Sequence, residues 1–277
     1  MKISVSMYSF HRTVYKENWT VLDFLDFAKA QSLEGVELLD IYWKDIENEL
    51  PEVKRALSKY GLTVSAYDVT NNFVKKEKKE REKELDRVIE GIRTAKKLGA
   101  DVVRVFCGDL KQGIPYEEGK QWIVECLKKA VKYAEEAKIY LAVENHGFFA
   151  GKSEQVKEII EEVENPYVRS TFDTGNFLLV GEDPSEAFAR LKEEIVHVHF
   201  KDFRRKRETD PVGGFRSLTG EEWVAVSPFD GEVPLAKIVQ QMKNAGYDQW
   251  MSLEYEGYED PKKAVPAALE RIRGYVS

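Results

Sequence analysis

The chain of 277 residues has 42 lysines and arginines against 49 aspartates and glutamates, and 43% of its residues are hydrophobic. A net charge of −7 argues against nucleic acid as the main partner, because duplex binding requires a basic surface. No run approaches the roughly 18 apolar residues of a membrane span, and the start, MKISVSMYSF, lacks a signal-peptide pattern, so we expect a cytoplasmic protein with no membrane contact. Cys107 and Cys126 lie far apart, which excludes a disulfide framework or a cysteine zinc site.

Short segments rich in β-branched and apolar residues alternate with segments of helical periodicity along the chain. The predicted strands are 3–8, 35–39, 62–67, 101–106, 140–145, 168–173, 196–201 and 250–255. The clearest helices are 20–31, 51–60, 76–98, 122–137, 153–163, 184–194, 233–245 and 262–275. Eight such pairs in about 250 residues predict an α/β fold, the (β/α)8 TIM barrel. We see no linker and predict a single domain over 1–277. A doubly wound open sheet is the alternative, but no glycine-rich phosphate fingerprint follows the first strand.

The segment IVHVHFKDF, residues 195–203, has polar residues at every second place of an apolar strand. Alternate side chains of a barrel strand point into the lumen, and the chemistry gathers at the C-terminal ends of the strands. We therefore expect His197, His199 and Lys201 to point inward, with His199 near the mouth, while Val196 and Val198 pack outward against helices. Structural polar residues that are hydrogen-bonded in the core are the alternative.

Carboxylates end the neighbouring predicted strands on the same inward face, at Glu144, Asp173 and Glu254. Three buried carboxylates would repel one another strongly unless a cation lies among them. Together with a neutral His199 they form a mostly oxygen ligand set, which favours Mn²⁺ and also accepts Mg²⁺, Co²⁺ or Zn²⁺. We predict one divalent metal ion at Glu144, Asp173, His199 and Glu254.

A salt-bridged core without a metal is the alternative interpretation of these carboxylates. In that case Lys201 and Arg104 would be the counterions. Arg104 ends the inward-facing part of the fourth strand, as Glu37 and Asp68 do for the second and third strands. These three side chains are candidates for binding substrate hydroxyls or for supporting the metal ligands.

Four strings on successive strands, VENHG, FDTGN, HVHFKD and SLEYEG, resemble the sugar-phosphate isomerase/epimerase family of xylose-isomerase-like TIM barrels. The resemblance runs over essentially the whole chain. It implies that Glu144, Asp173, His199 and Glu254 hold one divalent metal, and that Glu144 and Glu254 act as acid and base on opposite faces of the substrate. Members of the family include ketose 3-epimerases, hydroxypyruvate isomerase and inosose dehydratase. Dimers and tetramers are common among them, so a homo-dimer or homo-tetramer is expected.

Two positions depart from the pattern of the best-defined epimerases. Asn176 stands where those enzymes carry a substrate-binding histidine, and Ala150 stands where they carry a second glutamate. We still expect Asn176 to contact the substrate from that position. These departures argue against a free-ketose 3-epimerase. His146, two residues after Glu144, is positioned to replace one of the lost contacts, and a structural hydrogen bond to the next loop is the alternative.

Further substrate contacts are predicted around the mouth of the barrel. Three basic residues in and just beyond the seventh strand, Lys201, Arg204 and Arg205, are candidates for binding a phosphate or carboxylate of the substrate, although such a basic run is also typical of a solvated loop. Tyr8 follows the first strand and is expected to wall the pocket. Residues 204–230 form a connection longer than is usual in a barrel, which indicates a lid.

These residues together predict a divalent-metal-dependent isomerase or epimerase of a small keto-sugar or related α-hydroxycarbonyl compound. The reaction would transfer a proton through an enediolate, which a chelating metal stabilises. An inosose-type dehydratase on the same scaffold is the alternative. An abasic-site endonuclease fits less well, because its three metals need more histidines than the four present. A non-catalytic barrel that binds a sugar or polyol is a further alternative, and it would have no use for opposed bases.

Overall fold

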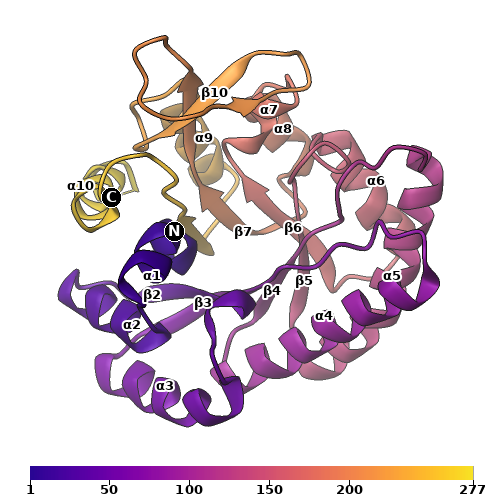
Figure 1. Cartoon of the computed structure of the whole chain (residues 1–277), viewed down its shortest axis with the longest axis horizontal. Coiled ribbons are helices and arrows are strands. Elements are labelled where there is room, and N and C mark those ends of the chain that lie inside the picture. The colour runs from indigo at the N-terminus through magenta and orange to yellow at the C-terminus, as the bar shows by residue number, and fades with distance from the viewer. Residues whose placement is uncertain (277) are drawn as a thin grey trace.

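The centre of the molecule is a closed barrel of parallel strands, which the computed structural model describes together with the rest of residues 1–276 (Figure 1). Around the barrel the strands follow the order β1-β11-β7-β6-β5-β4-β3-β2. Their bounds are β1 Lys2–Ser6, β2 Gly35–Leu39, β3 Thr63–Val69, β4 Val102–Val105, β5 Tyr140–Glu144, β6 Val168–Asp173, β7 Ile195–Phe200 and β11 Trp250–Leu253. These are the eight strands that the sequence predicts, so the TIM barrel is confirmed.

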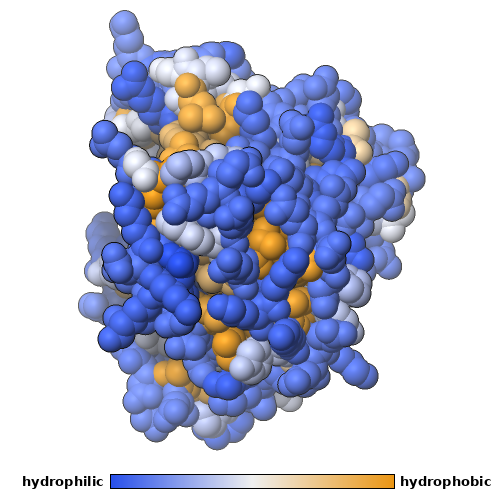
Figure 2. Space-filling model, turned by 90° about the vertical axis from the view of Figure 1, so that its right-hand side faces the viewer, coloured by the Kyte–Doolittle hydropathy of each residue, from blue (hydrophilic) through white to orange (hydrophobic). Residues whose placement is uncertain are grey.

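Helices surround the barrel and bury their apolar sides against it. The longer ones are α2 Val21–Ala30, α3 Ile46–Tyr60, α4 Lys78–Leu98, α5 Tyr116–Ala137, α6 Ser153–Val163, α8 Pro184–Leu191, α9 Leu235–Asn244 and α10 Pro261–Val276. Shorter segments are η1 Met7–Phe10, α1 His11–Glu17, η2 Asp40–Tyr42 and α7 Asn176–Leu179. Figure 2 shows that the face on the α5 and α6 side is largely hydrophilic, with apolar residues only in small patches. Within residues 1–276, no helix combines the length and apolarity needed to cross a membrane.

The start of α3 differs from the sequence prediction, which placed it at Pro51. The helix begins at Ile46, because the carboxylate of Asp45 accepts the backbone N–H of Asn48 at 3.3 Å and caps it. Pro51 lies inside the helix near its first turn. Pro51 is the sixth residue of the helix, so it lacks one backbone hydrogen bond there but does not mark the start.

The prediction that Val196 packs outward against helices is wrong. The pairing between β6 and β7 shifts between Ser170 and Thr171, so that Ile195 faces Ser170 and His197 faces Thr171. Val196 is the extra residue of this β-bulge, and it packs against Ala66, Val102 and Ala142 in a small cluster separate from the main core. The bulge thereby breaks the simple alternation at the start of β7, while His197 and His199 remain fully buried.

The predicted lid segment after β7 is a small antiparallel sheet rather than an irregular loop. It consists of β8 Asp202–Arg205, β9 Phe215–Arg216 and β10 Glu222–Val226, in the order β8-β10-β9. Figure 1 shows β10 in orange beside α7 and apart from the barrel strands. The carboxylate of Asp202 accepts backbone N–H groups from Phe229 and Gly231, both at 2.9 Å, and from Val233 at 3.1 Å. Through these hydrogen bonds Asp202 holds residues 229–233, which follow the small sheet, next to the end of β7.

Candidate active site

The C-terminal ends of the barrel strands surround a cavity of about 430 Å³. Glu144 at the end of β5, Lys201 after β7 and Glu254 after β11 line it. Phe215 and Arg216 of β9 line it as well. The prediction that residues 204–230 close one side of the pocket is therefore confirmed.

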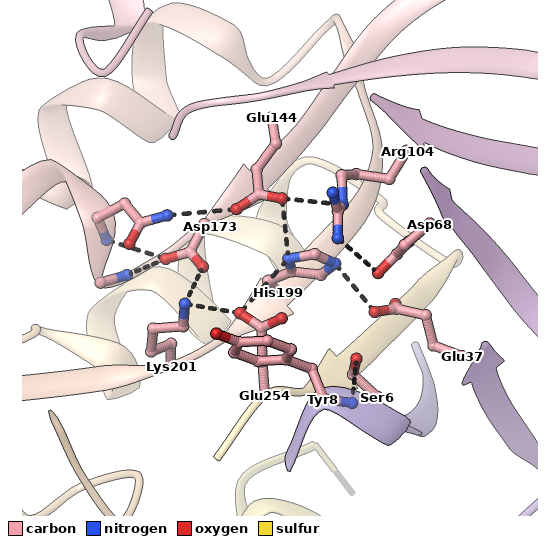
Figure 3. Close-up of polar contacts among 12 residues, drawn as sticks. Ser6, Tyr8, Glu37, Asp68, Arg104, Glu144, Asp173, His199, Lys201 and Glu254 are labelled. Carbon is pink, nitrogen blue, oxygen red and sulfur yellow. Dashed lines mark hydrogen bonds and ion pairs between the residues drawn. The ribbon is translucent and has the colours of Figure 1, made fainter. Parts of the chain in front are cut away.

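The four predicted metal ligands lie close together, and two of them, Glu144 and Glu254, line this cavity. Glu144, Asp173 and His199 each offer a ligand atom, and these atoms all lie within 4.8 Å of one another. His199 Nδ1 lies 3.5 Å from Glu144 Oε2 and 3.8 Å from Glu254 Oε2 (Figure 3). All four side chains are buried, so water cannot readily neutralise their charges.

Two cations already contact these carboxylates, as the salt-bridge alternative predicts. Arg104 Nε lies 3.1 Å from Glu144 Oε2, and Arg104 Nη2 lies 3.0 Å from Asp68 Oδ2. Lys201 Nζ lies 3.1 Å from Asp173 Oδ2 and 2.6 Å from Glu254 Oε2. A third carboxylate oxygen, Oε1 of Glu256, lies 2.5 Å from the same ammonium. Figure 3 shows Lys201 and Arg104 on either side of the ligand group.

The cations do not balance the carboxyl groups of the lumen. The buried carboxyl groups are those of Glu37, Asp68, Glu144, Asp173 and Glu254. Against these five stand two permanent cations, Arg104 and Lys201, and burial raises the pKa of Asp68 well above its usual range, so that this carboxyl group keeps a proton. In addition, Asp173 Oδ2 and both ring nitrogens of His199 make no hydrogen bond within the described residues. Ligand atoms that make ion-pair contacts but no hydrogen bond, in a lumen with more carboxyl groups than permanent cations, fit a divalent cation, and the mostly oxygen donor set suits a hard one.

The pKa values in the lumen show the same imbalance. Burial lowers the pKa of His199, but Glu37, Glu254 and Glu144 raise it well above its usual range. Burial raises the pKa of Asp173 to about 6, with Lys201 acting in the opposite direction and Glu144 and Glu254 adding to the increase. Without a metal the site therefore favours bound protons at His199 and Asp173, and a metal would replace them.

Glu37 orients the histidine of the ligand group. His199 Nε2 lies 3.1 Å from Glu37 Oε1, and the other carboxylate oxygen of Glu37 is hydrogen-bonded to His197 Nε2. A carboxylate beside Nε2 favours the ring proton there, which leaves the lone pair of Nδ1 directed toward Glu144 and Glu254. The sequence indicated that Glu37 faces inward but not that it joins both histidines of β7.

Asn176 and His146 both line the cavity, as does Tyr8. Asn176 Nδ2 donates to Glu144 Oε1 at 3.3 Å and to the carbonyl of Asn145 at 3.1 Å, so it holds Glu144 in place. The ring of His146 packs on Phe106 with centroids 4.2 Å apart, and burial lowers its pKa. Burial raises the pKa of Tyr8 to about 12, and Glu256 and Glu254 add to this, so Tyr8 keeps its proton.

Arg205 does not reach the cavity, which corrects its predicted role as a substrate ligand. Its guanidinium lies over the ring of Trp223, and it pairs with Glu232 at 2.5 Å and with Glu221 at 3.7 Å instead of lining the cavity. Arg204 also points elsewhere, to Asp210 at 2.5 Å. Lys201 is the only residue of the predicted basic group 201, 204 and 205 that lines the cavity.

Several wall residues were missed by the sequence reasoning. Phe106 and Phe148 follow β4 and β5, and Phe215 and Arg216 come from the lid sheet. Strand alternation identifies residues on the inner face of a barrel, but these residues lie on connections with no such period. A phenylalanine directly after a strand, such as Phe106, was the one available signal.

The model of the xylose isomerase-like TIM barrel family matches residues 25–275. Inosose dehydratase of Lacticaseibacillus casei is 37% identical over 97 residues, which are 34% of this chain and 32% of that protein, so the match spans a minor part of either. Inosose dehydratase of Clostridium botulinum is 24% identical over an alignment of 277 residues that covers 90% of this chain and 89% of the relative. The crystal structure of the IOLI protein with a bound zinc atom has 18% sequence identity and a TM-score of 0.82, over 100% of this chain and 98% of that one, and shows the shared fold. Because the family model covers most of its length, this chain belongs to the xylose isomerase-like TIM barrel family.

Proposed function

We propose that this protein is a metal-dependent dehydratase that removes water from inosose or a closely related polyhydroxylated ketone. The inosose dehydratases among its relatives support this reaction class. The observation that carries the proposal is the pair formed by Lys201 and Glu254, whose charged atoms lie 2.6 Å apart in the wall of the cavity. Dehydration needs one group that takes a proton and one that gives a proton, and this pair supplies both.

Glu144, Asp173, His199 and Glu254 would hold the metal, which we expect to be Mn²⁺ from the mostly oxygen ligand set. Zinc is the second choice, since the IOLI protein was solved with zinc. A bound divalent ion would polarise the carbonyl group of the substrate and so acidify the neighbouring C–H bond.

The side chains can then complete the proton balance. Glu254 removes the proton from the carbon next to the carbonyl, and the ammonium of Lys201 gives a proton to the hydroxyl that leaves from the adjacent carbon as water. Lys201 carries that proton at the start, because Asp173, Glu254 and Glu256 raise its pKa well above its usual range although burial lowers it. A proton transfer from Glu254 to Lys201 restores both groups for the next turnover.

The surroundings of Glu144 favour dehydration over epimerisation. Inversion at one carbon needs a base on each face, and both must exchange protons readily. Burial raises the pKa of Glu144, but His199 and Arg104 lower it more, so it lies well below its usual range. Glu144 therefore stays ionised and suits a metal ligand better than a proton carrier.

An isomerase or epimerase of a small keto-sugar is the second candidate, because Glu144 and Glu254 both line the same cavity. One experiment separates the two. The Mn²⁺-loaded protein is incubated in deuterated water with inosose, hydroxypyruvate and a panel of keto-sugars, and products are followed by mass spectrometry and NMR. We expect inosose to yield a product lighter by one water, and Lys201→Met to abolish this loss. A product of unchanged composition with deuterium next to the carbonyl would replace dehydration by isomerisation or epimerisation.

A further inference from the structure

A second cavity of about 240 Å³ adjoins the cavity that Glu144 and Glu254 line, which we call the metal-side cavity. The two cavities share Tyr8, Phe215 and Glu256 as lining residues. We call the second cavity the outer chamber. His11 of α1, Tyr258 of the connection between β11 and α10, and Val212 of the lid segment complete its outline. A ligand that fills the metal-side cavity can therefore extend past Glu256 into the outer chamber.

The one permanent cation that lines the outer chamber within residues 1–276 is fixed by the backbone. Arg12 is the one lysine or arginine among its described lining residues, and its two terminal nitrogens are held by backbone carbonyls of the connection between β11 and α10. Its guanidinium donates to the backbone carbonyls of Tyr258 at 3.2 Å, Glu259 at 3.0 Å and Gly257. Burial lowers the pKa of His11, so its imidazole is neutral at pH 7. Glu256 is the one carboxylate among the lining residues that the structure describes and is paired with Lys201, so the wall offers an anionic ligand no unpaired side-chain cation except the Arg12 guanidinium, which is held by three carbonyls.

The groups that remain suit a neutral, hydroxylated ring. His11 Nδ1 is hydrogen-bonded to the hydroxyl of Tyr42 at 2.9 Å, so its other ring nitrogen is available to a ligand. The carboxylate of Glu256 accepts hydrogen bonds, and the hydroxyls of Tyr8 and Tyr258 both donate and accept them. Phe215 and Tyr258 are 42% and 41% exposed, and such aromatic surfaces pack against the apolar faces of sugar rings.

We propose that the outer chamber is a second subsite that binds a neutral sugar or polyol unit joined to the ketone ring in the metal-side cavity. The physiological substrate would then be a glycosylated keto-polyol rather than a free or phosphorylated one. This inference rests on the proposed function for the identity of the ring on the metal side. The sugar or polyol unit in the outer chamber is inferred from the lining residues that the two cavities share, from the backbone contacts of Arg12, and from the exposed rings of Phe215 and Tyr258.

The test uses unreactive inositols, so that binding is measured without turnover. Isothermal titration of the Mn²⁺-loaded full chain compares myo-inositol, inositol monophosphates and a panel of galactosyl-inositols that differ in the linked carbon. We expect at least one galactosyl-inositol to bind about tenfold more tightly than myo-inositol, which corresponds to roughly 1.4 kcal/mol. The monophosphates should gain nothing.

Two variants act on the outer chamber alone. Tyr258→Ala removes an aromatic wall and Val212→Trp fills the space, and each should erase the gain while the affinity for myo-inositol stays unchanged. Tyr133→Ala is the matched control, since Tyr133 is 43% exposed on α5, away from both cavities, and it should keep the gain.

The subsite is overturned if no galactosyl-inositol gains affinity, if the gain survives in both variants, if a monophosphate gains instead, or if none of these compounds binds. Failure of the proposed function is a separate result, namely no loss of water from inosose by the unmodified protein. In that case a gain that depends on Tyr258 would still establish the subsite.

Discussion

Two buried lysines, Lys201 in the lumen and Lys120 on α5, each contact three carboxylates, yet they have different surroundings. Both side chains are 5% exposed. The Lys120 ammonium lies 3.0 Å from Glu117, 2.5 Å from Glu158 and 2.8 Å from Glu162. These three carboxylates are 71%, 42% and 41% exposed. The partners of Lys201 are Asp173, Glu254 and Glu256, at 0%, 6% and 17%.

The number of ion pairs is therefore the same in the two clusters, and the solvation of the carboxylates is what differs. Water solvates the carboxylates around Lys120, so each keeps its charge at little cost, whatever the lysine does. The carboxylates around Lys201 are cut off from water, and only other groups in the lumen can neutralise them. Burial of the partner carboxylates is therefore the feature that separates the lumen cluster from the one on α5.

The largest difference between the two clusters should appear in catalysis. Glu254→Gln removes the proposed base and is expected to lower kcat/KM for water loss from inosose by about 10³-fold or more. Glu158→Gln, which makes the same change beside Lys120, should leave the rate within about twofold, since surface substitutions are usually nearly neutral. Equal rates for the two variants would remove the distinction between the clusters.

Stability should separate the two lysines themselves. Lys201→Met leaves three poorly solvated carboxylates without their cation and is expected to lower the free energy of unfolding of the metal-free protein by about 3 kcal/mol. Urea unfolding with and without Mn²⁺ measures this. Added Mn²⁺ should recover part of the loss, because a metal at the same carboxylates replaces the missing charge. If Mn²⁺ stabilised the variant no more than it stabilises the unmodified protein, the metal and the ammonium would not share these carboxylates.

Glu37→Gln tests whether the lumen cluster is built for a metal. The variant loses the charge that holds the proton on Nε2 of His199, and we expect Mn²⁺ affinity to fall by about 10–100-fold. Competition with a fluorescent chelator measures the affinity without reference to activity. Circular dichroism should show an intact fold, and Glu158→Gln again serves as the control. Unchanged affinity in Glu37→Gln would limit Glu37 to a packing role.

The smallest effect is expected on the surface. Lys120→Met should cost about 1 kcal/mol of unfolding free energy or less, because the three carboxylates regain water when the lysine is lost. The difference between Lys120→Met and the unmodified protein should shrink further in high salt, which screens exposed charges. A loss of stability as large as that of Lys201→Met would show that the burial of the partner carboxylates is not what separates the clusters.

The sequence alone was sufficient for the barrel and for the polar residues at its mouth. The eight strands are short, apolar and separated by long amphipathic helices, so local periodicity determines them. The same alternation identified Glu144, Asp173, His199 and Glu254 as inward residues, because a side chain at every second place must face the same side of a strand.

Only the tertiary structure decided which of these side chains meet and what surrounds them. The bulge at Val196 arises from the pairing of β6 with β7. The position of Arg205 is set by the pairing of β8 with β10, two strands that are separated in the sequence. The contacts of Lys201 and of Glu37 likewise join strands that are distant in the chain. Such contacts depend on register and on distances between strands, and these have no local period that a sequence could display.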